Sequence, residues 1–505
     1  MKVKGMSLCG SWLLLFSLIT FPLFAQQQDI EITRRDIIKY GTESEIASLV
    51  NSLRTENADY LDEELIAIAQ NSKNTKIVSS VFAFFGEREK NGLESRAIKA
   101  VIERDDEIND TVFAAIDYLG RVKSADAVPV LIKLIDTEER RFLNNGFRAL
   151  GRAGAANRQT ANEAAEFLID YYENRTPADE SKREIITAIG ATGSLLGIDL
   201  LSDIAKETAE RAPLRIAAVD ALSKIGDKKC LDPIISCITA NDPNVRSAAV
   251  AALGPFSGSE VDNAILEAFR DSYYRSRIAA AQASRTRRLS TAVPFLKFRA
   301  ERDEVPAVRE ESIRALGEIG NTEANETLKT LFEERKNSDR LRILSADMLM
   351  KNVPDENFNK VVQEMDDAKR RNQTGLFNGL LKVVGEASLF GDTSEISIVT
   401  SRFLKTGTVI EKLFALDMIA NNNLRGFNED INTLTQDRNE TIARKARRTL
   451  EALEDYSSGK KQRAKPRENT PAVQRTVSNE QITVVNEQAA AGNEQTTESN
   501  EQTTE

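Results

Sequence analysis

The chain has 505 residues, of which 41% are apolar and 29% are charged, a composition typical of a folded soluble protein. It contains no histidine, which excludes Ser-His-Asp and Cys-His catalysis, histidine-ligated zinc or haem, and histidine-based pH switching. The net charge of −10 argues against general nucleic-acid binding, because such binding needs a basic footprint.

The first 25 residues have the layout of a secretory signal peptide. Lys2 and Lys4 form a positive start, residues 13–24 form an apolar stretch, and the small residue Ala25 follows. The stretch is shorter than the roughly 20 residues of a transmembrane helix, although an uncleaved anchor is the alternative. We therefore expect cleavage after Ala25 and export to the periplasm or cell surface of a bacterium. We expect no transmembrane segment in the mature chain, which is compatible with peripheral association with the envelope.

A repeat array occupies most of the chain. Residues 26–70 are less regular and are expected to form N-terminal capping helices, and the array itself covers residues 71–455. One phrase reads Ala-Leu-Gly-Glu-Ile-Gly at 315–320 and Ala-Leu-Gly-Arg-Ala-Gly at 149–154. Positions equivalent to its first glycine recur from residue 86 to about residue 420, at a mean spacing near 33 residues. A fixed period of this length predicts stacked helical repeats.

Each repeat has the same internal order. An apolar first helix such as 127–135 is followed by a polar break and by a second helix such as 245–253. Apolar residues fall at i, i+3, i+4 and i+7, which predicts helices with one buried face. We expect Asp242 or Asn244 to cap a second helix and Gly254 to end it in a left-handed conformation. Sustained alternation typical of strands is absent from the array.

These units resemble HEAT-like repeats of the short, phycobilisome-lyase-type class. The matching residues are Leu214, Arg215, Asp242, Val245, Arg246, Gly254, Val308, Arg309, Ala315, Leu316, Gly317 and Gly320. Ser284 and Met350 depart from the usual glycine, which predicts irregular turns there. The resemblance implies an all-α fold, a right-handed α-solenoid of about twelve stacked antiparallel helix pairs. In such arrays the second helices usually line a concave binding face. The resemblance supplies no catalytic residue.

Arginines recur at one place in the second helices, at Arg215, Arg246 and Arg309. One interpretation is a basic ladder that grips carboxylates or phosphates of a ligand. The other is a structural ladder in which each arginine pairs with an aspartate in an adjoining turn, such as Asp242. The structural interpretation is favoured, because the same arginine recurs in repeats of unrelated function.

A local reversal of charge lies between residues 272 and 300. The segment contains no acidic residue and seven basic ones, namely Arg275, Arg277, Arg285, Arg287, Arg288, Lys297 and Arg299. In an acidic chain this predicts a candidate patch for an anionic partner, such as an acidic protein, a lipid headgroup or a polysaccharide. The alternative is a solvated surface neutralised by acidic residues of neighbouring repeats.

Cys230 and Cys237 are the only cysteines of the expected mature chain. In one predicted helix they would lie roughly 10 Å apart, which is too far for a disulfide with each other. Both fall at core positions of the repeat, so we expect small buried apolar side chains. No metal-ligand spacing occurs, and no cofactor is predicted.

The C-terminal segment, residues 456–505, departs from the repeat pattern. A basic hinge around Pro466 precedes Asn-Glu-Gln triplets that recur every seven residues. The heptad positions carry no paired apolar residues, so a coiled coil is not expected. Low hydrophobicity and polar repetition predict a disordered tail.

The leading functional hypothesis is an exported, non-enzymatic scaffold that binds a protein or other macromolecular partner along its concave face. The runner-up is an enzyme or enzyme subunit of the lyase-like HEAT-repeat kind, which would need a pocket carboxylate with a strongly shifted pKa. A nucleic-acid binder is a third hypothesis, and only the 272–300 segment supports it.

Overall fold

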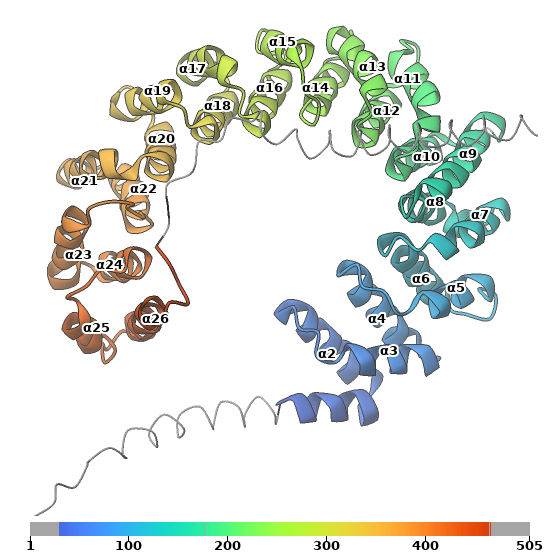
Figure 1. Cartoon of the computed structure of the whole chain (residues 1–505), viewed down its shortest axis with the longest axis horizontal. Helices are drawn as coiled ribbons and strands as arrows, with labels where there is room; N and C mark the ends of the chain where they lie inside the picture. The colour runs from blue at the N-terminus through green and yellow to red at the C-terminus, as the bar shows by residue number, and fades with distance from the viewer. Residues whose placement is uncertain (1–29, 176, 464, 466–505) are drawn as a thin grey trace, which may run out of the picture. The chain divides into compact units, whose positions relative to one another are not determined.

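The computed structural model describes residues 30–175, 177–463 and 465, so the predicted signal peptide and most of the predicted tail lie outside the described residues. Within these residues the regular elements are all helical and no strand occurs (Figure 1). This confirms the all-α prediction. The chain divides into two compact units, Met1–Val245 and Arg246–Glu505, and each is described by itself.

The first unit begins with a helix at residues 30–40 and continues as helix pairs. Its elements are α2 (Glu43–Glu56), α3 (Asp62–Asn71), α4 (Thr75–Glu87), α5 (Glu94–Ile102), α6 (Asn109–Arg121), η1 (Ala125–Ala127), α7 (Val128–Asp136), α8 (Arg140–Gly154), α9 (Arg158–Asn174), α10 (Asp179–Thr192), η2 (Leu195–Gly197), α11 (Ile198–Lys206), α12 (Ala212–Ile225), η3 (Lys228–Cys230), α13 (Leu231–Ser236) and η4 (Cys237–Thr239). Helix α14 (Pro243–Ala252) contains the division between the units.

The second unit continues the same pattern. Its elements are α15 (Ser259–Ala268), α16 (Tyr274–Arg287), η5 (Ser290–Ala292), α17 (Val293–Arg302), α18 (Pro306–Ile319), α19 (Thr322–Glu333), α20 (Asp339–Asn352), α21 (Pro354–Arg370), α22 (Thr374–Gly385), α23 (Ser394–Thr406), α24 (Val409–Asn422), α25 (Asn428–Leu434) and α26 (Glu440–Ser457). Pairs α3/α4 to α11/α12 and α15/α16 to α25/α26, with α13 and α14 between them in sequence, agree with the predicted number.

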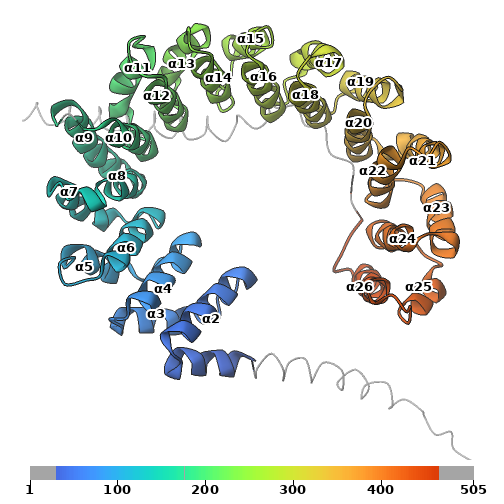
Figure 2. The same cartoon turned by 180° about the vertical axis from the view of Figure 1, so that it is seen from behind.

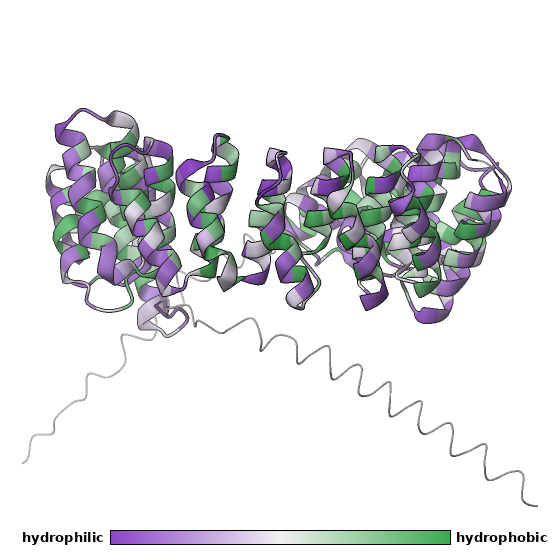
Figure 3. Ribbon diagram, turned by 90° about the horizontal axis from the view of Figure 1, so that it is seen from above, coloured by the Kyte–Doolittle hydropathy of each residue, from purple (hydrophilic) through white to green (hydrophobic). Residues whose placement is uncertain are grey.

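Each unit has two layers. The even-numbered second helices contact one another along the stack, as α6, α8, α10 and α12 do in the first unit, and each also packs on its odd-numbered partner. Figure 2 shows the same order in the second unit, with α16, α18 and α20 in one layer and α15, α17 and α19 in the other. The layers follow from the sequence, since the helices seen in Figure 3 carry both hydrophobic and hydrophilic residues along their length.

Close approach between successive second helices explains the repeated phrase. A Cβ atom added at Gly151 of α8 would lie 2.5 Å from the carbonyl oxygen of Ala188, and one at Gly120 would lie 2.8 Å from the Cα atom of Ala149. Ala149 and Ala188 are the alanines of the following phrases. The alanine of the next repeat therefore occupies the space that a side chain at each of these glycines would need. The phrase marks the place where one repeat packs closely on the next.

The helix ends correct two expectations about the glycine position. The second glycine of the phrase, not the first, adopts the left-handed conformation at Gly193, Gly226 and Gly320, whereas Gly154 ends α8 without a positive φ. Gly254 has no positive φ, so its predicted left-handed cap is wrong, although Asp242 does cap α14 by accepting from the backbone N–H groups of residues 244 and 245. Ser284 and Met350 lie inside α16 and α20, so the predicted irregular turns are wrong there.

None of the helices in the described part of the chain is long and apolar enough to cross a membrane.

Candidate functional site

The predicted arginine ladder lies at the joints between repeats. The Nε atom of Arg215 donates to the carbonyl oxygen of Ala205 at 2.9 Å, at the end of the first helix of the same pair. Arg309 makes the equivalent bond to Ala300 at 2.9 Å. Each guanidinium thus satisfies a carbonyl that the helix end leaves open.

The same arginines also reach forward to the next repeat. Arg246 binds both carboxylate oxygens of Asp271, at 2.8 and 3.0 Å, and Arg309 donates to the side-chain oxygen of Asn337 at 3.2 Å. Of the three predicted members, Arg246 pairs with an aspartate as the structural interpretation expects, but that aspartate is Asp271 of the next repeat and not Asp242. Arg309 pairs with an asparagine instead.

Two further members of the ladder were missed by sequence reasoning. Arg342 donates from Nε to the carbonyl oxygen of Phe332 at 2.9 Å and lies 3.0 Å from Glu364. Arg277, which was assigned to the basic segment, forks onto both oxygens of Asp303 at 2.8 and 2.9 Å. The spacing of 31 to 33 residues from Arg246 to Arg342 was the signal that would have found them.

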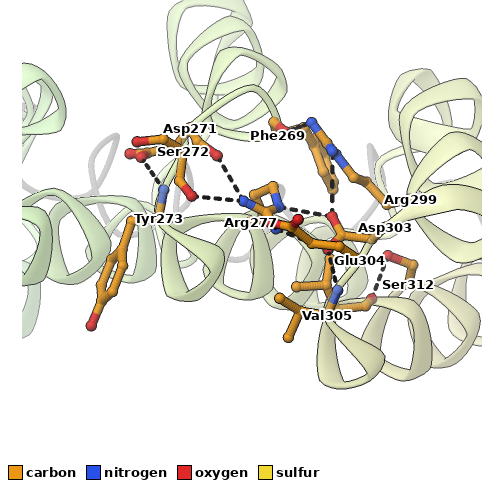
Figure 4. Close-up of polar contacts among 11 residues, drawn as sticks. Phe269, Asp271, Ser272, Tyr273, Arg277, Arg299, Asp303, Glu304, Val305 and Ser312 are labelled. Carbon is orange, nitrogen blue, oxygen red and sulfur yellow. Dashed lines mark hydrogen bonds and ion pairs between the residues drawn. The ribbon is translucent and has the colours of Figure 1, made fainter.

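Asp303 is the centre of a buried charge cluster (Figure 4). Its side chain is fully buried, and it accepts from Arg277, from Arg299 at 3.3 Å and from the backbone N–H of Val305. Burial by itself would raise the pKa of this carboxyl. The hydrogen bonds from Arg277 and Val305 and the positive charges of Arg277 and Arg299 outweigh burial and lower the pKa of Asp303 below its usual value.

Acidic residues of neighbouring helices pair with most of the basic segment. Arg285 lies 3.2 Å from Glu311, and Arg288 lies 2.7 Å from Glu318. The remaining pairs are Arg287–Asp262, Arg277–Asp303 and Arg299–Asp303. Among the described residues Arg275 and Lys297 make no ion pair. The seven basic side chains therefore do not form one free patch.

A groove on the second-helix layer of the first unit lies between α10 and α12. It has a volume of about 350 Å³ and is lined by Arg183, Thr187, Pro213, Ile216, Ala217, Asp220, Ala221 and Lys224. The apolar residues lie on the face of α12, and the charged side chains surround them. An apolar floor with a few polar groups is typical of binding sites.

Of the three charged residues that line this groove, Arg183 lies 3.9 Å from Glu184, whereas the other two make no such pair in the described part of the chain. Among the described residues Asp220 and Lys224 make no ion pair and no side-chain hydrogen bond. Asp220 is exposed at the groove. Neighbouring atoms still remove part of its water, and this desolvation raises the pKa of Asp220. The positive charge of Lys224 lowers the same pKa, but by less. Sequence reasoning missed this groove because no motif marks it.

The chain is similar to known proteins in sequence and in fold. The pattern of the family described as "Spirochaete HEAT repeat protein" matches residues 38–449, which is most of the chain. The chain belongs to this HEAT repeat family. The family resemblance predicted from the phrase and its spacing is thereby confirmed.

One curated relative of this HEAT repeat protein is deoxyhypusine hydroxylase from Candida glabrata, 30% identical over 149 residues, which cover 28% of this chain and 46% of that protein. Similar solved structures include Kap121p (TM-score 0.43, 10% identity, 80% of this chain and 49% of that chain) and Kap95p with RanGDP (0.46, 13%, 85% and 66%). Human deoxyhypusine hydroxylase is another (0.23, 16%, 53% and 96%). The HEAT repeat protein thus spans about half the length of its curated relative and of Kap121p.

Cys230 and Cys237, the two cysteines in the described part of this HEAT repeat protein, are both free and buried. They bracket α13, with Cys230 ending η3 and Cys237 beginning η4, so the single predicted helix is a helix between two 3-10 turns. Burial raises the pKa of the Cys230 thiol to about 11. Both behave as the predicted small core residues. Within residues 30–175, 177–463 and 465, no cluster of three or more metal-ligating side chains occurs.

Proposed function

We propose that the protein is an exported, non-enzymatic HEAT repeat scaffold that binds a protein partner along the layer of its second helices. The observation that carries the proposal is the groove between α10 and α12, whose lining combines apolar side chains with Asp220 and Lys224, two charged residues that make no ion pair among the described residues. Charged groups that the fold leaves unpaired at the surface stay hydrated and are available to a partner.

The composition of the groove favours a protein rather than a nucleic acid as partner. Arg183 and Lys224 are accompanied by Asp220 on the same surface. A carboxylate repels phosphates, whereas a protein surface offers groups of both signs. The charge of the whole chain, −10, acts in the same direction.

Export is the second part of the proposal. The charged start, the apolar stretch and Ala25 within residues 1–25 support it. A fusion of these residues to alkaline phosphatase, which is active only outside the cytoplasm, is expected to be active in Escherichia-type host cells. A fusion with Lys2→Glu and Lys4→Glu is expected to lose much of that activity, and equal inactivity of both fusions would contradict export.

An enzymatic role is the alternative, and the similarity to deoxyhypusine hydroxylase over 149 residues favours it. The raised pKa of Asp220 has the direction that a general acid needs. Because the chain has no histidine, the chemistry would depend on carboxylate, tyrosine or arginine side chains.

Affinity capture from the envelope fraction of the source cells tests the scaffold against this alternative. Three baits are compared, namely residues 26–505, the same chain with Asp220→Lys, and a matched control with Asp199→Lys. Asp199 is also an exposed, unpaired aspartate of the described chain, but it lies on the first helix α11. We expect the wild type and the Asp199 variant to enrich the same protein and the Asp220 variant to lose it. Equal recovery by all three baits would contradict binding at the groove.

A further inference from the structure

An aromatic groove lies on the first-helix layer of the second unit, between the end of α15 and helix α17. It has a volume of about 280 Å³ and is lined by Phe269, Arg270, Pro294, Phe295, Phe298 and Arg299. The rings of Phe269 and Phe295 stack at 5.8 Å and form its base. Phe298 stands at its edge with 51% of its surface exposed, which is unusual for a large aromatic side chain.

Basic side chains surround these rings. The guanidinium of Arg270 lies 5.5 Å from the Phe295 ring, and those of Arg299 and Arg302 lie 5.4 and 5.9 Å from the Phe298 ring. Lys297 precedes Phe298 on the exposed side of the same helix. The guanidinium groups of Arg299 and Arg302 thus lie beside the Phe298 ring, but they leave that ring exposed to solvent.

The described residues that line the groove include two basic side chains, Arg270 and Arg299, and no acidic one. Arg270 has only an exposed pair with Glu267, which is worth little in water. Asp303 is shared by Arg277 and Arg299, so one carboxylate serves two guanidinium groups. Arg302 and Lys297 make no ion pair among the described residues. Burial lowers the pKa of Arg299, and the negative charge of Asp303 offsets part of that effect.

We propose that this groove binds an acidic peptide segment of a protein partner, which inserts one large apolar side chain against Phe295 and Phe298 and places carboxylates on Arg302, Lys297 and Arg270. The apolar base supplies affinity for the inserted side chain, and the basic side chains select acidic neighbours. The proposal does not rest on the α10/α12 groove, which belongs to the first unit and is formed by second helices.

The geometry favours a peptide over single-stranded nucleic acid, the other polyanion that stacks on aromatic rings. The groove is a pit for one side chain rather than a track for successive bases, because Phe298 is the only strongly exposed aromatic ring among the described residues of α15 and α17. The guanidinium of Arg299 is also held inside, by the carbonyl oxygen of Phe269 and by Asp303.

Fluorescence anisotropy of the protein spanning residues 26–505 tests the proposal. The probe is a labelled heptapeptide with one central phenylalanine and three aspartates on each side. We expect binding that weakens at least tenfold with Phe298→Ala and at least threefold with Arg302→Ala. Both residues are exposed, so neither change threatens folding. The matched controls, Ile398→Ala and Lys405→Ala, change exposed residues of the first helix α23 and should leave binding unchanged.

Two competitor probes complete the experiment. A heptapeptide with a central alanine is expected to bind at least tenfold more weakly than the phenylalanine peptide. A thymidine heptanucleotide is expected not to displace the peptide. Equal affinity of the alanine peptide would show that charge alone determines binding and would overturn the proposal. Displacement of the peptide by the oligonucleotide, or unchanged peptide binding by the Phe298 variant, would also overturn it.

Discussion

Gly190 of α10 lies against Ala221 of α12, so closely that a Cβ atom on Gly190 would be 2.5 Å from the Ala221 Cα atom. Carbon atoms of two different residues that are not bonded to each other do not approach this closely, and the two backbones meet only because one residue has no side chain. The same kind of contact joins Gly151 and Ala188 one repeat earlier in the chain. Stacking in the first unit therefore depends on a small number of glycines.

A single methyl group should disturb this contact. Gly190→Ala is expected to lower the free energy of unfolding by about 2 kcal/mol or more, because α10 and α12 must move apart. Gly254→Ala is the control, since its added methyl group would meet only a carbonyl oxygen at 3.5 Å and its φ is not positive. Urea unfolding curves measure both. Equal loss in the two variants would contradict the close-packing explanation.

The phrase was predictable from the sequence, but its physical role was not. Periodicity identified the repeats, their helix pairs and the core positions of Cys230 and Cys237. It could not distinguish a glycine that ends a helix from one that receives a neighbouring helix, since both give the same spacing. The error at Gly254 came from this ambiguity, because the left-handed conformation falls on the second glycine of the phrase at Gly193, Gly226 and Gly320.

The candidate sites were less predictable, because pairing of charges joins residues some 25 to 35 positions apart. Arg285, Arg287 and Arg288 look free in the sequence, but acidic residues of α15 and α18 neutralise them. The unpaired Asp220 carries no local mark that separates it from other surface aspartates. Only the three-dimensional arrangement shows which charges the fold uses and which it leaves for a partner.

The buried cluster at Asp303 should be important for stability. Asp303→Ala leaves Arg277 buried without its partner and is expected to cost about 3 to 5 kcal/mol of the free energy of unfolding. Glu304→Ala is the control, because Glu304 lies 4.0 Å from Arg277 but its side chain is 86% exposed. Denaturant unfolding of both variants measures the difference. A cost for Asp303→Ala no larger than that of Glu304→Ala would contradict the assignment.

Acid should weaken the same cluster. The pKa values of Asp271 and Asp303 are lowered in the folded protein, so ionised carboxylates there add stability above the unfolded pKa of about 3.9. That stability is lost as the pH falls below about 4, through the lower pKa of the folded state. The free-energy difference between wild type and Asp303→Asn should therefore shrink between pH 5 and pH 2. A difference that stays constant over this range would show that ionisation of Asp303 is not involved.

The thiols should be inert in the folded protein. Cys230 and Cys237 have 0% and 1% of their surface exposed, and burial raises the pKa of both thiols. Ellman's reagent is expected to modify neither cysteine of residues 26–505 at pH 8 within minutes, and to modify both in 6 M guanidinium. Rapid reaction of either native thiol would show that this part of the first unit opens readily.

Photo-cross-linking tests the central claim, binding of a protein partner at the second-helix layer, most directly. A benzophenone amino acid is placed at position 220 in one strain and at position 199 in another, and intact cells are irradiated. The scaffold proposal predicts a discrete cross-linked protein from position 220 and none from position 199. The same product from both positions, or no product from position 220, would contradict it.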